Sequence, residues 1–168
     1  MQPDDLRRVA IAETTWSRLR AVELTSGIGV PALGDVLRAV GRRARVYVEI
    51  KGSGIEQLVV DSLARAETEC AIHSFDHDAV VTVRSLAPSV ARGILFDRYP
   101  ARVRQAMDRA GARDVWPKWS LVDRPLVDAV HGAGGRVIVW TVNDRYEAAR
   151  LVDIGVDGVC SDDLRQVG

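Results

Sequence analysis

The stretch 136–163, RVIVWTVNDRYEAARLVDIGVDGVCSDD, decides the fold class. It begins with an apolar, β-branched run over 136–142, which is typical of a strand covered on both faces. A helical segment follows, with Asn143 as its predicted N-cap and Gly155 as its stop signal. A second short apolar run covers 157–161. Strand, helix and strand with short connections predict a parallel βα arrangement, because parallel strands need a crossover between them.

The same alternation extends over most of the chain. Apolar, β-branched runs occur at 45–51, 70–75, 92–97, 113–116, 136–142 and 157–161. Helical spacing appears between several of them, over 53–67, 76–87, 125–135 and 143–155. Two architectures fit this pattern, a doubly wound open sheet and a (β/α) barrel, and periodicity alone does not separate them.

The residues at the predicted strand ends favour the barrel. A barrel places its chemistry on one rim, at the carboxyl ends of its strands. The residues expected there are polar or aromatic: Glu49, Lys51, Ser74, Phe75, Asp76, Phe96, Asp97, Trp116, Trp119, Trp140, Thr141, Asn143, Ser161 and Asp162. We therefore expect an α/β fold of the parallel TIM-barrel type.

The barrel is expected to be incomplete. Six strands are predicted, whereas a closed barrel of this type has eight. We expect a single domain over 1–168, in which 1–44 form a linker and a helix beginning near Pro31, and 45–168 form six βα units. Open strand edges are then expected at 45–51 and 157–161, and exposed edges favour association.

Composition excludes several classes of partner. The 168 residues include 23 basic and 23 acidic side chains, a formal net charge of zero, which does not favour nucleic-acid binding. We expect no secretory signal and no membrane span, because no apolar run approaches the required length of about 20 residues. Cys70 and Cys160 are expected as buried free thiols in a reducing, cytoplasmic setting.

Glu49 and Lys51 are the first candidate site residues. They lie two positions apart in VYVEIKG, so both side chains point to the same face of the predicted strand. A carboxylate there can hold a hard divalent cation, and an ammonium can contact a phosphate oxygen. The alternatives are an ion pair across the sheet, or a Lys51 that simply reaches solvent.

Three histidines are available for proton transfer. His73 shares its face with Phe75 and is the candidate acid, whereas His77 is expected on the surface and His131 at a helix C-terminus. Further carboxylates have alternative structural explanations, since Asp76 and Asp162 are predicted helix caps and Asp97 is ambiguous. Trp140 is large enough to close one wall of a pocket or to cap the core. Glycine-rich phosphate loops and a nucleophile elbow are absent from the sequence.

The order of these pieces resembles one family. GIGVPALGDVL, VYVEIKG, IHSFDHDAV, GILF and VIVWTVNDRYEAARLVDIGVDGVCSDD follow one another as in the glycerophosphodiester phosphodiesterases. The resemblance implies a TIM barrel that hydrolyses glycerophosphodiesters to glycerol 3-phosphate and an alcohol with Ca²⁺ or Mg²⁺. It further implies that Glu49 is a metal ligand, that Lys51 contacts phosphate, and that Phe75 and Trp140 line the substrate pocket.

The sequence departs from the family at its front. The family's His-Arg-Gly motif and its Glu-x-Asp pair followed by His-Asp do not occur, and these motifs supply the acid, the base and two metal ligands. The resemblance covers about the last two thirds of the family's domain. The absent motifs belong to the same two βα units that are missing from the predicted barrel. An alternative function is an inactive barrel that forms a homodimer through its open edges and binds a phosphate-type anion at Lys51.

Overall fold

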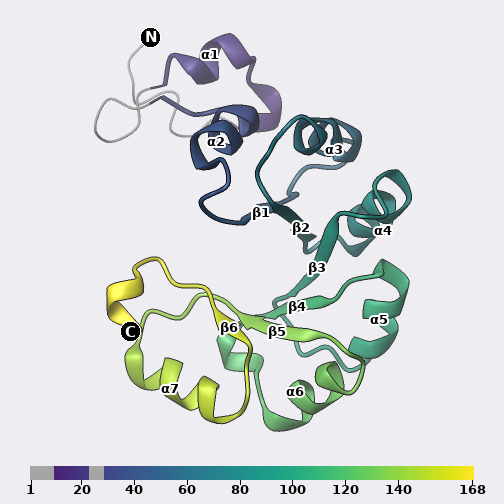
Figure 1. The fold of residues 1–168 in the computed structure, drawn as a ribbon, viewed down its shortest axis with the longest axis vertical. Coiled ribbons are helices and arrows are strands. Elements are labelled where there is room, and N and C mark those ends of the chain that lie inside the picture. Colours follow the sequence, from purple (N-terminus) through teal and green to yellow (C-terminus); the bar gives the residue numbers. More distant parts are fainter. Residues whose placement is uncertain (1–9, 23–28) are drawn as a thin grey trace.

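One parallel sheet organises the computed structural model, which describes residues 10–22 and 29–168 (Figure 1). Adjacent strands pair in parallel, in the order β1-β2-β3-β4-β5-β6. The strands are β1 (Val46–Glu49), β2 (Cys70–Ser74), β3 (Ala91–Phe96), β4 (Asp114–Pro117), β5 (Arg136–Val139) and β6 (Gly158–Val159). Each overlaps one of the six predicted runs.

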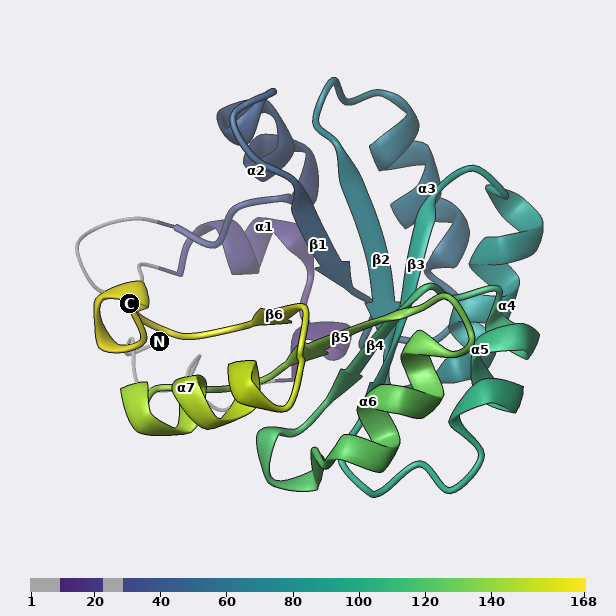
Figure 2. The same cartoon turned by 60° about the horizontal axis from the view of Figure 1, so that its bottom comes forward.

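The strand order separates the two predicted architectures. A doubly wound sheet reverses its order at a switch point, whereas here every strand lies beside its successor in the chain. The sheet curls, and its helices follow the outer, convex side (Figures 1 and 2). In the part of the chain that the structure describes, six strands thus form the incomplete barrel that was predicted, with β1 and β6 as its two edges. A single domain over residues 1–168 stays a prediction, and residues 1–9 and 23–28 of the predicted linker lie outside the described residues.

Helices lie on the convex side, where the first two precede β1 and the others connect successive strands. They are α1 (Trp16–Arg20), α2 (Leu33–Val40), α3 (Glu56–Ala64), α4 (His77–Leu86), α5 (Val103–Ala110), α6 (Arg124–His131) and α7 (Arg145–Asp153), with 3-10 turns at Ile11–Glu13, Trp119–Leu121 and Leu164–Gln166. Helix α5 is not among the predicted helical segments. This helix buries Val103, Met107 and Ala110 on one side and ends at Gly111, whose φ of 57° suits glycine.

Two predicted helix N-caps can be compared with the structure. Asp76 caps α4 as predicted, because its side chain accepts hydrogen bonds from the N–H groups of Asp78 and Ala79. The prediction for Asn143 is wrong, since Asp144 caps α7 by accepting from the N–H groups of Tyr146 and Glu147. Both residues belong to the type that caps helices, so the local pattern fits either register.

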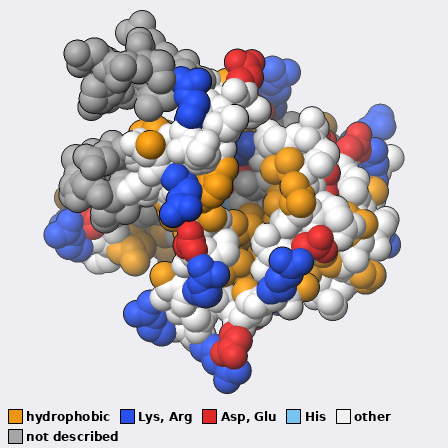
Figure 3. All heavy atoms as spheres, turned by 90° about the horizontal axis from the view of Figure 1, so that it is seen from above, with side chains coloured by type: hydrophobic (Ala, Val, Ile, Leu, Met, Phe, Trp, Pro, Cys, Tyr) orange, Lys and Arg blue, Asp and Glu red, His pale blue; other side chains and the backbone are white. Residues whose placement is uncertain are grey.

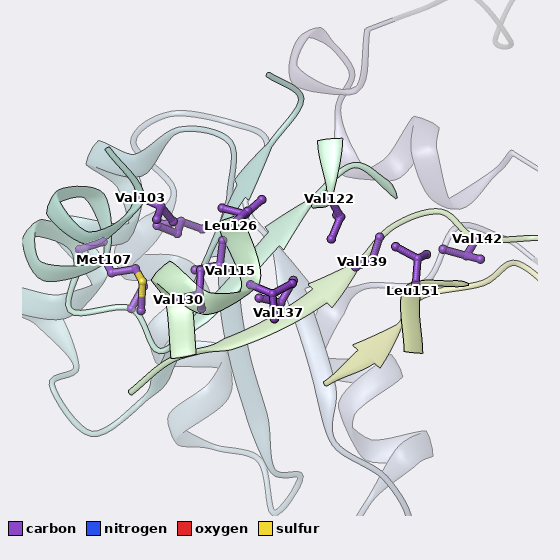
Figure 4. Close-up of a cluster of buried hydrophobic side chains, with 14 of the residues drawn as sticks. Val103, Met107, Val115, Val122, Leu126, Val130, Val137, Val139, Val142 and Leu151 are labelled. Atoms are coloured by element: carbon purple, nitrogen blue, oxygen red, sulfur yellow. The ribbon is translucent and has the colours of Figure 1, made fainter. Parts of the chain in front are cut away.

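The main core lies between the sheet and its helices. Figure 4 shows Val115 and Val137 from the strands packed with Met107, Leu126 and Val130 from α5 and α6. A smaller cluster of Leu95, Trp116 and Ile138, with Tyr47 and Trp140 beside it, covers the concave face of the sheet. Alternate strand residues therefore face opposite sides, as the period of two requires.

Gly93 on β3 lets the concave face pack closely. A Cβ atom at this position would lie 2.8 Å from Nε1 of Trp116 and 3.1 Å from the carbonyl oxygen of Asp114. Only glycine leaves room for the indole at this distance, so the position of Trp116 depends on Gly93.

The surface carries mixed charge. On the face seen in Figure 3, acidic and basic side chains are interspersed and hydrophobic side chains gather between them. On this face, the mixture of signs matches the zero net charge of the sequence. Within the described ranges 10–22 and 29–168, no helix is both long enough and apolar enough to span a membrane.

Candidate active site

A cavity of about 500 Å³ opens on the concave face, toward the carboxyl ends of the strands. All five candidate site residues line it, together with residues from the other strands. Its lining consists of Tyr47, Glu49, Lys51, His73, Phe75, Leu95, Trp116, Trp140, Thr141 and Cys160. The parallel order brings these residues together because every strand presents the same end to the rim.

Glu49 and Lys51 form an ion pair at the end of β1. The distance between Lys51 Nζ and Glu49 Oε2 is 3.4 Å, and the side chains are 78% and 26% exposed, respectively. Both side chains are therefore on one face, as the sequence predicts. The ion pair is local, between the last residue of β1 and a residue just beyond it, and is therefore not the ion pair across the sheet that was the alternative.

His73 lies on β2 in register with Glu49 and is 8% exposed. Its ring packs edge-on against Trp116 with 4.7 Å between centroids, and its Nδ1 atom has no hydrogen-bond partner. Burial lowers the pKa of His73, while the charges of Glu49 and Asp114 oppose that shift. Burial thus favours the neutral imidazole, which suits a proton acceptor better than the predicted acid. A role for His73 in proton transfer stays a prediction.

Phe75 and Trp140 form one wall of the cavity. Their rings meet edge to face with 5.4 Å between centroids, and Phe75 is 44% exposed. Trp140 donates a hydrogen bond of 2.8 Å from Nε1 to the carbonyl oxygen of Trp116, and Trp119 N–H bonds to the carbonyl oxygen of Trp140. These bonds hold the indole in place, so the wall is largely formed before any ligand binds.

A charged pair lies on the concave face at the opposite ends of the strands. Arg136 makes a bidentate contact with Asp114, with distances of 2.9 Å from Nε and 2.7 Å from Nη2. Asp114 is buried, and the pKa of Arg136 is raised by its hydrogen bond to Asp114. This pair was not among the predicted site residues. Its signal was a charge at the first position of two apolar strands, which register places side by side.

The remaining carboxylates do not converge on the cavity. Asp76 is engaged as a helix cap, and Asp97 is exposed. The prediction that Asp162 caps the last helical turn is wrong, because Asp163 caps it. Asp162 instead accepts a 2.7 Å hydrogen bond from Asn143 Nδ2, and its N–H donates to Asn143 Oδ1 at 3.0 Å.

The other histidines are structural. His77 was expected on the surface, but it is half-buried and its Nε2 atom lies 3.0 Å from the carbonyl oxygen of Leu95. His131 ends α6 as predicted, and its Nε2 atom lies 2.8 Å from Asp157 Oδ2. Neither lines the cavity, so His73 is the histidine available to the site among the described residues.

The two cysteine side chains are less buried than predicted. Cys70 and Cys160 are both free, but Cys70 is half-buried and Cys160 is exposed. Cys160 follows the short edge strand β6, whose outer side pairs with no strand in the described ranges 10–22 and 29–168. Partial burial raises the pKa of each thiol.

A divalent cation is not fully accommodated by these side chains. Ca²⁺ and Mg²⁺ take about six or more oxygen ligands, several of them carboxylates in most protein sites. Glu49 is the one carboxylate that lines the cavity, and residues 10–22 and 29–168 hold no cluster of three or more His, Cys, Asp or Glu side chains that could bind a metal. The described residues therefore supply one ligand and do not by themselves form a metal site.

Comparison with known proteins identifies the family. Residues 5–166 match the model of the glycerophosphoryl diester phosphodiesterase family. The chain belongs to this family. It is 26% identical over 149 residues to a glycerophosphodiester phosphodiesterase of Caldanaerobacter subterraneus, covering 84% of this chain and 61% of the relative. It is also 26% identical over 152 residues to one of Bacillus subtilis, covering 79% and 51%, respectively.

Solved structures of the family share the fold. A phosphodiesterase from Oleispira antarctica, in complex with the product sn-glycerol 3-phosphate, matches 95% of this chain with a TM-score of 0.85 and 22% identity. A glycerophosphodiester phosphodiesterase from Agrobacterium tumefaciens matches 95% with a TM-score of 0.80 and 18% identity. This chain covers 71% and 73% of those two chains. It thus spans only part of its relatives, about three fifths of the Caldanaerobacter enzyme.

Proposed function

We propose that this chain forms the phosphate-holding side of a glycerophosphodiester phosphodiesterase, which hydrolyses its substrate to glycerol 3-phosphate and an alcohol. The observation that carries the proposal is the convergence of Glu49, Lys51, Phe75 and Trp140 on one cavity in a member of this family. The names of the curated relatives, and the product bound in the Oleispira structure, support the same chemistry.

Each of these side chains suits a part of such a substrate. The exposed ammonium of Lys51 can meet a phosphate oxygen as a point charge. Phe75 and Trp140 can pack against the carbon skeleton and keep water from that side of the phosphate. Because the wall is held by the Trp140–Trp116 hydrogen bond, substrate binding requires little rearrangement there.

A divalent cation, Ca²⁺ or Mg²⁺, is part of the proposal through the family resemblance. Such an ion would stabilise negative charge on the phosphate when bound. Among the described residues, Glu49 is the one that would hold it. The other ligands would come from water, from the substrate, or from groups other than the described residues, so we assign no step to the ion.

Proton transfer is the weakest part of the site. The histidine motifs of the family do not occur in these 168 residues, and losing a general acid or base typically costs about 10²–10⁴-fold in rate. We infer that His73, which is in register with Glu49 and whose neutral form is favoured by burial, accepts the proton. We therefore expect the chain alone to be slow, and faster when the family's front segment is restored.

Release of glycerol 3-phosphate from glycerophosphocholine tests this proposal. The purified chain is assayed with Ca²⁺ or Mg²⁺, with EDTA, and as Glu49→Ala, alone and as a fusion that adds the first two βα units of a relative. Activity that requires the fusion, the metal and Glu49 supports the proposal. Glu67→Ala, which removes an exposed carboxylate away from the cavity, is the matched control. A folded fusion without activity, or activity indifferent to Glu49, contradicts it.

The open sheet favours a second candidate function, an inactive protein that self-associates. β1 and β6 end the sheet, and their outer edges have no strand partner in the described part of the chain. Such edges can pair with those of a second copy. Light scattering after size exclusion decides between the two. A stable homodimer without turnover in the fusion assay favours this candidate, and an active monomer excludes it.

We further propose a cytoplasmic setting. Cys70 and Cys160 are both unpaired, which is usual where cellular thiols are kept reduced. Fractionation of cells that express the chain with a C-terminal tag tests the location. Recovery in the membrane or extracellular fraction would contradict it.

A further inference from the structure

Three arginines link consecutive helices on the convex side of the sheet. Arg84 of α4 reaches the end of α5, Arg104 of α5 reaches the end of α6, and Arg124 of α6 reaches the end of α7. In each case the guanidinium donates to a main-chain carbonyl in the last turn of the next helix. Each helix ends before the next strand begins, so these contacts lie at the amino ends of the strands, away from the cavity.

Each arginine binds a carbonyl oxygen that the next helix leaves without a main-chain partner. The N–H groups that follow each helix bind to other carbonyls of its last turn. The carbonyls of Arg109, Ala129 and Asp153 instead accept from the arginines, at distances of 3.0, 3.1 and 3.0 Å. The last carbonyls of a helix need such partners, and a cation near them is favoured by the helix dipole. The cap of each helix is therefore supplied by the helix before it.

Gly132, directly after α6, makes room for one of these contacts. A Cβ atom at this position would lie 2.6 Å from Nη2 of Arg104. The φ angle of Gly132 is −64°, which any residue can adopt, so the backbone conformation does not require glycine here. Close packing of the guanidinium does favour it.

The linked helices begin at α4. Within residues 29–168, no arginine of α2 or α3 donates to the end of the next helix, and the carbonyls that follow α4 are bound by Arg92 of the succeeding strand, β3. The core is divided at nearly the same place. Leu37, Val59 and Ile72 from α2, α3 and β2 belong to a smaller cluster, separate from the main core under α5 to α7.

We propose that the three arginines hold α4 to α7 together as one unit, and that β1 and α3 open before this unit does. Opening here means transient local unfolding that exposes main-chain amides to water. The cavity then spans the boundary between two parts of unequal stability. Glu49 and Lys51 lie at the end of the part that opens first, whereas Trp116 and Trp140 lie on the linked part. The inference goes beyond the proposed function and depends on neither a ligand nor turnover.

Native-state hydrogen exchange of the full chain, followed by NMR at low urea concentrations, tests this order of opening. A single hydrogen bond of this kind changes an equilibrium by roughly twofold to tenfold, so three of them should separate the two parts by about tenfold or more. We therefore expect the most protected amides of β1 and α3 to exchange at least about ten times faster than those of β4, β5 and α6. Equal protection in the two parts would overturn the proposal.

Removal of one link tests whether the helices form a unit. Arg104→Met is expected to speed exchange throughout α5, α6 and β5 by roughly twofold to tenfold, and to leave β1 and α3 unchanged. Arg150→Met is the matched control, because this exposed arginine pairs with Glu147 of its own helix. It should leave exchange in α5 and α6 unaltered. The proposal fails if Arg104→Met has no more effect than Arg150→Met, or if its effect is confined to the last turn of α6.

A double-mutant cycle separates the link from other effects of the substitutions. Gly132→Ala should displace the guanidinium of Arg104 and so speed exchange in the same elements. When both changes are combined, the second should cost nothing further, because the contact is already lost. Effects that simply add would show that Arg104 does not act through the end of α6, and would overturn its role as a link.

Discussion

Trp140 and Trp116 are joined by a 2.8 Å hydrogen bond from the indole Nε1 of one to the main-chain carbonyl of the other. The bond links the Trp140 side of the cavity to strand β4. Trp116 in turn packs edge-on against His73 and Tyr47, with centroids 4.7 and 4.9 Å away. The aromatic wall and the candidate proton acceptor therefore belong to one packed unit.

Trp140→Phe should weaken the site more than it weakens the fold. The variant keeps an aromatic ring but leaves the carbonyl of Trp116 without its partner, a loss of about 0.5–1.5 kcal/mol. We expect the dissociation constant for sn-glycerol 3-phosphate, measured by calorimetry, to rise roughly twofold to tenfold. Trp16→Phe, in exposed α1, is the matched control and should bind as the unaltered chain does. Equal affinity in all three proteins would show that Trp140 is not part of the site.

Asp114→Ala should destabilise the fold strongly. It leaves the guanidinium of Arg136 partly buried without its bidentate partner, and we expect the free energy of unfolding in urea to fall by about 2 kcal/mol or more. Asp35→Ala removes one partner of an exposed pair with Arg38 and should cost within about 0.5 kcal/mol. A similar small loss in both variants would mean that the Asp114–Arg136 pair is not a structural support.

The Asp157 carboxyl should make stability fall at acid pH. Burial pushes its pKa upward, but the hydrogen bonds from His131 and from the N–H of Val137 outweigh burial and hold the pKa below its ordinary value of 3.8. A depressed pKa contributes stability that is present above 3.8 and is lost as the pH falls through the lower, folded value. The free energy of unfolding in urea, measured from pH 6 to pH 2, should therefore fall less steeply near pH 2 in Asp157→Asn than in the unaltered chain. Parallel curves would contradict this assignment.

Asn143 should stabilise the segment that follows β6 through its side-chain hydrogen bonds. Its side chain accepts from Ser161 Oγ and from the N–H of Asp162, and it donates to the Asp162 carboxylate. Asn143→Asp would replace the donor with a carboxylate that repels Asp162. We expect faster hydrogen exchange over 158–163 and a loss of stability of about 1–2 kcal/mol. Gln57→Glu makes the same chemical change beside Asp61 in α3 and should leave exchange over 158–163 unaltered. An equal effect of both variants would contradict this role of Asn143.

The arrangement of strands could be predicted because it depends on short-range features. The helical segments between successive strands force parallel pairing, and parity alone places Glu49 and Lys51 on one face. The alternation of strand residues does not predict how deeply a side chain is buried. It assigned His73 to the correct face, but the burial of its ring depends on Trp116 and Tyr47, which come from other strands.

Long-range contacts and alternative registers account for the rest. The Asp114–Arg136 pair depends on the register between β4 and β5, which no local pattern specifies. Asn143 and Asp144 are both cap-forming residues, so the choice between them was decided by the contacts that Asn143 makes with Ser161 and Asp162. Exposure of Cys160 follows from the edge position of β6, a property of the whole sheet.

The most direct test of the site is a titration of the ¹⁵N-labelled chain with sn-glycerol 3-phosphate, followed by NMR. The four tryptophan indole signals report from the cavity lining (Trp140 and Trp116), the neighbouring rim (Trp119) and helix α1 (Trp16). We predict saturable shifts of the Trp140 indole and of the Lys51 amide, lost in Lys51→Met, with the Trp16 signal unmoved. Shifts confined to the hollow between α2 and α3, or no saturable shift at all, would contradict the assignment of this cavity to a glycerophosphodiester.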